Sequence, residues 1–325
     1  MNKYGYIFLF LISLFSCRKI HRNSDYQNID FKQEMRKFVI GISQYAKNIK
    51  PDFLIIPQNG VELITQNGQE NGALHQQYLQ AIDGQGQEDF NYGFDGDDIP
   101  TSNDEHQYLK HFLDLEKGLD KKILITDYCS ITNHIAESYQ KNDQYGYTGF
   151  VAISRELDII PTIIHQENSE NINQLSQAKN FLYLINPANY ATKEEFIHTL
   201  KQTNYDLIIM DWSLNRIPFT SQELDSIKHK QNGGLRKIIA YVSIGEAESY
   251  RYYWQNDWDS NKPFWLEAEN PDWPGNYTVK YWEKSWQDII YGNNQSYIKK
   301  VIEAGFDGVY LDKIDSFEFF EERYN

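Results

Sequence analysis

Cysteine is nearly absent from this chain, with two residues in 325. Cys17 follows an apolar N-terminal segment, and only Cys129 remains beyond it. A single cysteine cannot form an internal disulfide, and no CxxC or HExxH spacing marks a zinc site. The fold must therefore rest on a packed core, which 41% hydrophobic residues can supply. Cys129 is expected to be a small buried side chain rather than a nucleophile.

Positive charge is also scarce, with 31 Lys and Arg against 46 Asp and Glu and a formal net charge of −15. Such acidity disfavours nucleic acid as a partner, because phosphate contacts need clustered basic side chains. The glycine patterns GxGxxG and GxxxxGK[ST] of nucleotide sites are missing as well. The same acidity favours a cationic ligand, such as an amino sugar polymer with free amines.

The apolar stretch near the N-terminus, residues 6–15, is too short to span a bilayer. It ends in Leu14-Phe15-Ser16-Cys17, which resembles the site at which bacterial lipoproteins are cleaved and acylated. We therefore expect a lipoprotein signal peptide over residues 1–17, lipidation of Cys17 and a polar tether over residues 18–33. The protein would then belong to the bacterial cell envelope, lipid-anchored or extracellular. The alternative is an ordinary signal peptide with an incidental cysteine.

Short apolar runs bounded by turn residues recur along the chain and indicate buried strands. A strand is expected at each of residues 53–56, 122–126, 181–185, 207–211, 237–243, 263–267, 277–281 and 308–312. Helical patterns occur at residues 34–49, 74–82, 108–119, 193–203 and 294–304. Pro161 demotes residues 158–165 to an extended loop or edge segment.

This alternation of strands and helices predicts an α/β fold. The specific expectation is a (β/α)8 TIM barrel over residues 34–325, with an insertion between the first two strands. The alternative is an open, doubly wound sheet.

Three of the predicted strands end at or just before an acid, namely Asp211, Glu246 and Asp312. The strands of a parallel barrel all end at one mouth, so these carboxylates are expected to line one cleft. Cleavage of a glycosidic bond needs one carboxylic acid to protonate the leaving oxygen and a second carboxylate to attack the sugar or activate water. The three acids therefore indicate a glycoside hydrolase. Glu246 is the preferred proton donor, because aromatic neighbours would raise its pKa, with Asp211 or Asp312 as nucleophile or base.

The acidic, glycine-rich segment over residues 83–98 raises a second possibility. Asp83, Asp95 and Asp97 are interspersed with glycine, as in calcium-binding loops, but the spacing and final glutamate of an EF-hand are missing. We therefore favour a solvated loop at the rim of the mouth, without metal or cofactor, over a metal-dependent hydrolase.

Three segments carry a resemblance to a known family. They are Ile55-Ile56-Pro57-Gln58-Asn59-Gly60, Tyr241-Val242-Ser243-Ile244-Gly245-Glu246-Ala247-Glu248 and Gly305-Phe306-Asp307-Gly308-Val309-Tyr310-Leu311-Asp312. Together they resemble glycoside hydrolase family 114, and within it the bacterial lipoprotein branch, over residues 34–318. The resemblance implies a TIM barrel and an endo-α-1,4-polygalactosaminidase activity on an amino sugar polysaccharide.

Tyr310 departs from the pattern of that family. The characterised polygalactosaminidases have a glutamate two residues before the aspartate of the last strand, where this chain has Tyr310. This departure keeps open a non-catalytic carbohydrate-binding lipoprotein of the same fold.

Other residues at strand ends and near the motifs are expected to bind the substrate. They are Asn59, Asp127, Tyr128, Trp212, Tyr241, Glu248, Arg251 and Asp315. Trp254 is a further candidate, although core packing is the alternative role of both Trp254 and Tyr241. The segment Asn270-Pro271-Asp272-Trp273-Pro274-Gly275-Asn276 is expected to form a rigid aromatic turn at the rim of the cleft.

Overall fold

The computed structural model describes residues 26, 28–187, 189–258 and 260–324. The predicted signal peptide, Cys17 and the first part of the predicted tether lie outside the described residues. The described chain is packed from its start, because the ring of Tyr26 contacts Trp282 and Tyr324. In these described ranges, we find no helix with the length and apolar character needed to cross a membrane.

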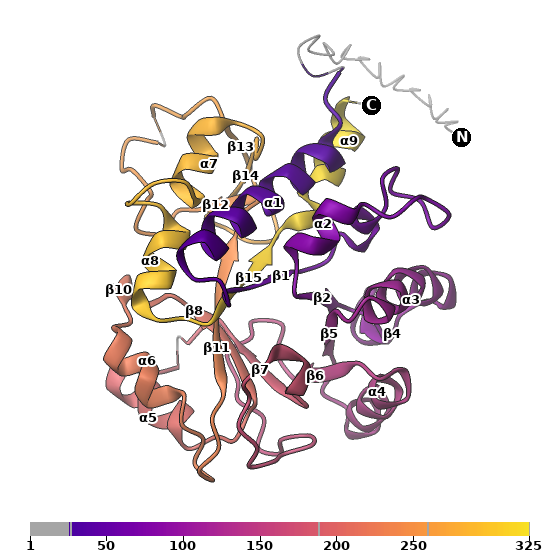
Figure 1. The fold of residues 1–325 in the computed structure, drawn as a ribbon, viewed down its shortest axis with the longest axis vertical. Coiled ribbons are helices and arrows are strands. Elements are labelled where there is room, and N and C mark those ends of the chain that lie inside the picture. Colours follow the sequence, from indigo (N-terminus) through magenta and orange to yellow (C-terminus); the bar gives the residue numbers. More distant parts are fainter. Residues whose placement is uncertain (1–25, 27, 188, 259, 325) are drawn as a thin grey trace, which may run out of the picture.

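The first helix, α1, spans Phe31–Ile49 (Figure 1). Its N-cap is Asp30, whose side chain accepts a hydrogen bond of 2.8 Å from the amide of Gln33. Apolar side chains at helical spacing bury one face of α1; they are Phe31, Met35, Phe38, Val39, Ile42 and Ala46. The helix begins before residue 34, so the end of the predicted tether belongs to the folded domain.

Within the described residues, eight parallel strands form two sheets at the centre of the fold. The larger sheet has the order β1 (Leu54–Pro57), β15 (Gly308–Asp312), β11 (Lys237–Ser243), β8 (Leu207–Asp211) and β7 (Phe181–Leu184). The smaller sheet has the order β2 (Gly84–Glu88), β5 (Lys122–Tyr128) and β6 (Thr148–Ala152). A parallel bridge between Gln58 and Gly86 joins β1 to β2, and β6 contacts β7. The predicted α/β class with parallel strands is confirmed.

Helices lie around the outside of the sheets and connect consecutive parallel strands, except that the long connection from β6 to β7 has only a short 3-10 helix at Leu175–Gln177 (Figure 1). They are α2 (Gln76–Ala81), α3 (Asn103–Gly118), α4 (Thr132–Tyr145), α5 (Lys193–Lys201), α6 (Ser221–Ile227), α7 (Lys284–Ile290) and α8 (Tyr297–Ala304), and α9 (Phe317–Tyr324) follows the last strand. The predicted helices are thus confirmed with shifted ends. Residues 158–165 contain neither helix nor strand, as expected from Pro161.

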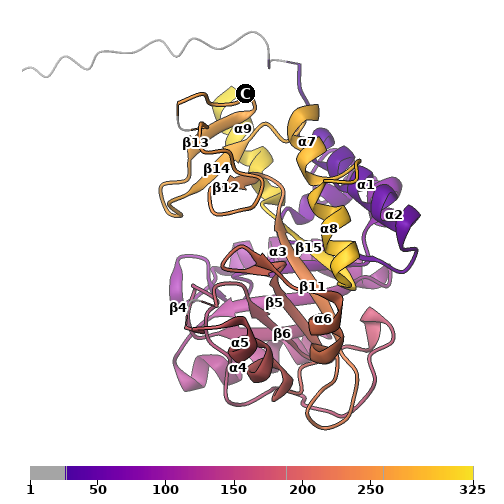
Figure 2. The same ribbon diagram turned by 90° about the vertical axis from the view of Figure 1, so that its left-hand side faces the viewer.

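Two of the strands predicted for the barrel are wrong. Residues 263–267 and 277–281 correspond to β13 (Leu266–Glu269) and β14 (Asn276–Val279), which form a small antiparallel sheet with β12 (Glu246–Glu248). Figure 2 shows this sheet apart from the parallel strands, above them in that view. Aromatic and β-branched residues predicted strands here correctly, but such composition does not specify which sheet a strand joins.

Two parallel strands, β2 and β6, were missed, and β2 lies in the segment predicted to be an insertion. Its sequence, Gly-Gln-Gly-Gln-Glu, has no apolar side chain. Close packing requires its glycines, since a Cβ on Gly86 would lie 2.0 Å from Oη of Tyr310. A Cβ on Gly84 would lie 2.6 Å from the carbonyl oxygen of Lys122. The segment between the first two predicted strands therefore contributes a parallel strand of its own.

Shorter strands complete the fold. They are the hairpin of β3 (Tyr92–Gly93) with β4 (Gly96–Pro100), and the pair β9 (Ser213–Leu214) with β10 (Ile217–Pro218).

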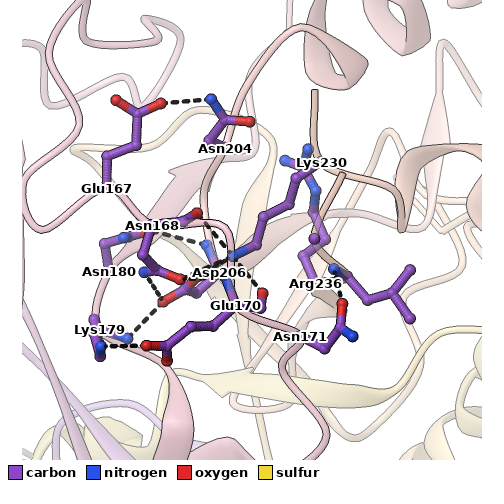
Figure 3. Close-up of polar contacts among 12 residues, drawn as sticks. Glu167, Asn168, Glu170, Asn171, Lys179, Asn180, Asn204, Asp206, Lys230 and Arg236 are labelled. Atoms are coloured by element: carbon purple, nitrogen blue, oxygen red, sulfur yellow. Dashed lines mark hydrogen bonds and ion pairs between the residues drawn. The ribbon is translucent and has the colours of Figure 1, made fainter. Parts of the chain in front are cut away.

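A buried ion pair lies at the amino end of β8, away from its carboxyl end. Lys230 and Asp206 are 2.5 Å apart, and both side chains have 0% exposure. Figure 3 shows the loop residues gathered around them. The ammonium also binds the carbonyl of Glu170 at 2.9 Å, and Asp206 accepts 2.7 Å and 3.0 Å bonds from the Lys179 amide and Asn168. The pair thus fastens the long connection between β6 and β7 to the sheet.

We predict that Lys230→Met destabilises the fold by about 3–5 kcal/mol, because it leaves the carboxylate of Asp206 buried without its partner. Urea unfolding measures the loss. Lys179→Met, at a pair with Glu170 whose side chains are 45% and 57% exposed, is the control and should cost about 1 kcal/mol or less. The double variant Asp206→Asn with Lys230→Met should be more stable than Lys230→Met alone. Equal losses in Lys230→Met and the control would contradict this role.

Candidate active site

A cavity of about 450 Å³ opens at the carboxyl ends of the parallel strands. Its walls include residues within two positions of the carboxyl ends of these strands, among them Gln58, Asn59, Glu88, Tyr128, Ile185, Asp211, Tyr241 and Asp312. The small antiparallel sheet supplies Glu246, Glu248 and Asn276. Parallel strands end on one side of their sheet, which is why side chains distant in the sequence meet here.

All three acids predicted to be catalytic line this cavity. Asp211 is the last residue of β8, and Asp312 is the last residue of β15. Glu246 opens β12, directly after β11. The structure therefore brings together carboxyl groups that the sequence placed at three strand ends.

Asp312 is held at the cavity wall by two hydrogen bonds. Oη of Tyr241 donates to it at 2.5 Å, and the backbone amide of Lys313 donates at 2.7 Å. Burial raises the pKa of Asp312 to about 6, Asp315 adds to the rise, and Lys313 and Tyr241 oppose it. At neutral pH the group is therefore ionised, and it gains a proton in mildly acidic solution.

Asp211 forms an ion pair with Arg251 at the cavity wall. Arg251, with a side chain only 6% exposed, binds both Asp211 and Glu248, the latter at 2.5 Å. The hydroxyl of Tyr250 donates to Glu248 at 2.6 Å. Burial raises the pKa of Asp211 to about 6, and the positive charge of Arg251 opposes the rise. Arg251 thus links an acid at the end of β8 to an acid of the small antiparallel sheet.

Glu246 has polar rather than aromatic neighbours at its carboxylate. Its Oε1 accepts a hydrogen bond of 2.9 Å from Asn270 and lies 3.5 Å from Nζ of Lys313. The aromatic environment expected around Glu246 is therefore not the one that contacts its carboxyl oxygens.

Most of the predicted substrate-binding residues also line the cavity. They are Asn59, Tyr128, Tyr241, Glu248, Arg251 and Asp315. Trp273, Pro274 and Asn276 border the same cavity, in agreement with the predicted aromatic rim.

Asp127 and Trp212 do not line the cavity, and these two predictions need correction. Asp127 is fully buried and accepts bonds of 2.7 Å from the amide of Asn91 and 2.6 Å from Ser138. Side chains alternate along a strand, so Asp127 faces away from the cavity that Tyr128 lines. Trp212 is 8% exposed and packs on aromatic rings of Tyr252 and Tyr297.

Trp254 and Cys129 have packing roles. Trp254 packs on Trp258 and Tyr277 rather than lining the cavity, which is the alternative weighed for it. Cys129 is buried and carries no disulfide, as expected.

Several residues of the cavity escaped prediction. They are Gln58, Glu88, Arg155, Tyr183, Tyr250 and Lys313. Glu88 ends β2, and its carboxyl oxygens accept hydrogen bonds from Gln58 and Tyr128. The polar sequence of β2 hid the strand, and with it the strand-end position of Glu88. Gly84 and Gly86, two residues apart, were the available signal, because glycine in a strand marks a place where neighbouring atoms approach the backbone closely.

Two of the three acids of the metal-dependent alternative, Asp83 and Asp97, have other partners. Asp83 pairs with Lys47 at 3.0 Å and accepts a bond from the amide of Ile55, while Asp97 pairs with Arg155 at 2.8 Å. In the part of the chain that the structure describes, no group of three or more His, Cys, Asp or Glu side chains is arranged to hold a metal ion. Asp83 lies next to β2 rather than in a loop at the rim.

Residues 203–324 match the sequence model of Glycoside-hydrolase family GH114. This region contains Asp211, Glu246 and Asp312, whereas Glu88 lies outside it. The match extends from the residues just before β8 to helix α9, at the carboxyl-terminal end of the chain.

Curated relatives share parts of the chain. An uncharacterised protein of Methanocaldococcus jannaschii is 42% identical over 156 residues, 48% of this chain and 43% of that protein. An uncharacterised protein of Thermotoga maritima is 40% identical over 123 residues, 38% and 36% of the two chains. One of Deinococcus radiodurans is 49% identical over 88 residues, 27% of each. The chain spans less than half the length of these relatives.

We predict that Asp127→Ala destabilises the protein by about 3 kcal/mol or more, because it leaves several buried donors unpaired at about 1–3 kcal/mol each. Chemical unfolding measures the change. Asp52→Ala, at an exposed turn before β1, is the control and should change stability by about 0.5 kcal/mol or less. An Asp127→Ala protein as stable as this control would show that the hydrogen bonds of Asp127 are dispensable.

Proposed function

We propose that this protein is a glycoside hydrolase that cleaves an α-linked amino sugar polysaccharide with carboxyl groups of the cavity. The observation that carries the proposal is the convergence of Asp211, Glu246 and Asp312 on one open cavity. Glycosidases place two carboxyl groups about 5–9.5 Å apart, on either side of the scissile linkage. The cavity, at about 450 Å³, has the size of a site for a small ligand or a sugar unit.

Asp312 is the proposed nucleophile or base. It is ionised at neutral pH, and its side-chain hydrogen bond comes from the uncharged hydroxyl of Tyr241. Asp211, by contrast, is paired with Arg251, and Glu246 lies against Lys313. We propose that Asp211 and Glu246 orient sugar hydroxyl or amine groups, with Glu246 as the alternative proton donor that the sequence favoured.

The charge of the cavity supports a cationic sugar polymer. Its lining has three cationic side chains, Arg155, Arg251 and Lys313. Against them stand seven carboxyl groups, from Glu88, Glu156, Asp211, Glu246, Glu248, Asp312 and Asp315. A negative excess attracts free amino groups of a sugar chain. The endo-α-1,4-polygalactosaminidase-like activity implied by the resemblance fits this charge.

A non-catalytic carbohydrate-binding protein of the same fold is the second candidate, and Tyr310 favours it. The ring of Tyr310 is fully buried against Tyr183, so this position gives the cavity no carboxyl group. Under this candidate the protein binds glycans without releasing products.

Fold and attachment enter the proposal as well. We propose that the two parallel sheets form one (β/α)8 barrel, supported by the bridge between Gln58 and Gly86 and the contact between β6 and β7.

We also propose that acylated Cys17 anchors the protein to the cell envelope, on the pattern of its leader.

We predict that Asp312→Asn lowers kcat/KM on the cleaved polymer by about 10²–10⁴-fold, because the amide cannot act as nucleophile or base. The assay measures release of reducing ends from a panel of α-linked amino sugar polymers, with free and with acetylated amines. Asp225→Asn, on the exposed side of α6, is the matched control and should keep wild-type activity.

Three outcomes separate the candidates. Loss of polymer cleavage in Asp312→Asn, with wild-type cleavage in Asp225→Asn, supports the hydrolase. Binding of a polymer by the wild type without release of reducing ends supports the carbohydrate-binding candidate. Full activity of Asp312→Asn removes Asp312 from the mechanism.

We further predict that kcat/KM of the wild type falls as the pH is lowered through about 6. The raised pKa values of Asp312 and Asp211, both about 6, mean that these carboxylates gain protons in that range. A pH–rate profile at subsaturating polymer measures this. A decline centred near pH 4, the range of an ordinary aspartate, would show that protonation of Asp312 and Asp211 does not control kcat/KM.

A further inference from the structure

Glu88 occupies a position in the cavity that the proposed mechanism has not yet used. It ends β2, and uncharged groups hold both of its carboxyl oxygens. Oη of Tyr128 binds Oε1, and Nε2 of Gln58 binds Oε2. Gln58 is fixed in turn, because its Oε1 accepts a bond of 2.9 Å from Tyr183. The carboxyl group is therefore oriented at the cavity wall by two uncharged donors.

The register of the strands places Glu88 across β1 from Asp312. The amide of Gln58 donates to Leu311 at 2.9 Å, and the amide of Asn59 donates to Gly86 at 2.9 Å. The end of β1 thus lies between β15 and β2. Neighbouring strands are about 4.8 Å apart, so strands on either side of β1 are about 10 Å apart at the backbone.

Two layers of side chains connect β15 and β2, the strands on either side of β1. Residues two apart on a strand face the same side, so Glu88 stands above Gly86 and Asp312 stands above Tyr310. In the lower layer, the ring of Tyr310 fills the space that a Cβ on Gly86 would need. In the upper layer, Glu88 and Asp312 both line the open cavity. Tyr310 is therefore a floor beneath two carboxyl groups that face one space.

We infer that Glu88 is the proton donor for the glycosidic oxygen and that Asp312 is its partner across the cleft. This inference rests on the proposed glycoside hydrolase function. Burial and the neighbouring charge of Asp312 raise the pKa of Glu88 to about 8, against the hydrogen bond from Tyr128 and the positive charge of Arg155. The pKa of Asp312 is about 6. Between these values Glu88 carries a proton and Asp312 is ionised, which is the division of roles that a glycosidase needs.

The chemical step is balanced with these two groups. Glu88 transfers its proton to the glycosidic oxygen as the bond from C1 to that oxygen breaks, and the leaving sugar departs as an alcohol. Asp312 attacks C1, or removes a proton from the water that attacks it. If Asp312 attacked, water then displaces it from C1 and gives a proton to Glu88, which restores both groups. If Asp312 acted as base, it releases the proton it took from water to solvent, and Glu88 regains one from solvent. In both cases water supplies the new hydroxyl on C1.

The test uses the dependence of the rate on the leaving group. We compare Glu88→Gln with Glu246→Gln, on the hydrolysed polymer and on a dinitrophenyl glycoside of its oligosaccharide. Dinitrophenolate leaves without protonation. We therefore expect Glu88→Gln to lower kcat/KM about 10²–10⁴-fold on the polymer and less than about tenfold on the aryl glycoside. Glu303→Gln, on the exposed side of α8, is the matched control and should lose neither activity.

Two outcomes overturn the inference. One is full polymer activity in Glu88→Gln, or equal losses on both substrates. The other is the leaving-group signature in Glu246→Gln, which would assign the donor to Glu246. A wild type that cleaves neither substrate would instead contradict the proposed function.

Two measurements keep the inference testable if Glu88→Gln does not fold. The first uses the wild type, whose kcat/KM should fall above about pH 8 on the polymer but not on the aryl glycoside; the same fall on both contradicts the inference. The second is infrared spectroscopy at pH 7, which needs no activity. Glu116 and Glu318 are replaced by Gln for this measurement, because burial raises the pKa of both carboxyl groups as well. Carbonyl-band intensity from protonated carboxylic acid should then be lost as the pH is raised through 8. A protein that loses no such intensity contradicts a protonated Glu88.

Discussion

Burial of carboxyl groups at the ends of parallel strands is the constraint on which the site depends. A carboxylate removed from water is costly unless donors or cations compensate it. The three acids predicted from the sequence are compensated differently, Asp211 by Arg251, Glu246 by Asn270 and Lys313, and Asp312 by Tyr241 and a backbone amide. These differences, rather than the number of acids, separate side chains suited to chemistry from those suited to orienting a ligand.

Packing below the site decides where its acids stand. Gly86 and Tyr310 fit together only because glycine has no side chain, and the ring then closes the space beneath Glu88 and Asp312. The glycines of β2 are therefore as much a part of the site as the acids above them. At the opposite end of β8, the pair of Lys230 and Asp206 fixes a long loop to the sheet and leaves the carboxyl end free for the cavity.

The sequence allowed the central part of the site to be predicted. β8, β11 and β15 are continuous apolar runs, and the acids at or after their ends meet because parallel strands share one direction. β2 was missed because its residues are glycine or polar, so no apolar run marks the strand that pairs in parallel with β5. Nor could the sequence assign β13 and β14 to a separate sheet, since strand propensity carries no partner information. Asp127 was misplaced because a strand end does not tell which way a given side chain points.

The most direct test of the account is a crystal structure of the Asp312→Asn protein with an amino sugar oligosaccharide. We expect one glycosidic oxygen to lie within about 3.2 Å of the carboxyl group of Glu88, with the adjacent C1 facing residue 312. An oligosaccharide bound elsewhere on the molecule, or bound in the cavity with its linkages away from both residues, would contradict the claim that the strand-end acids form one catalytic cleft.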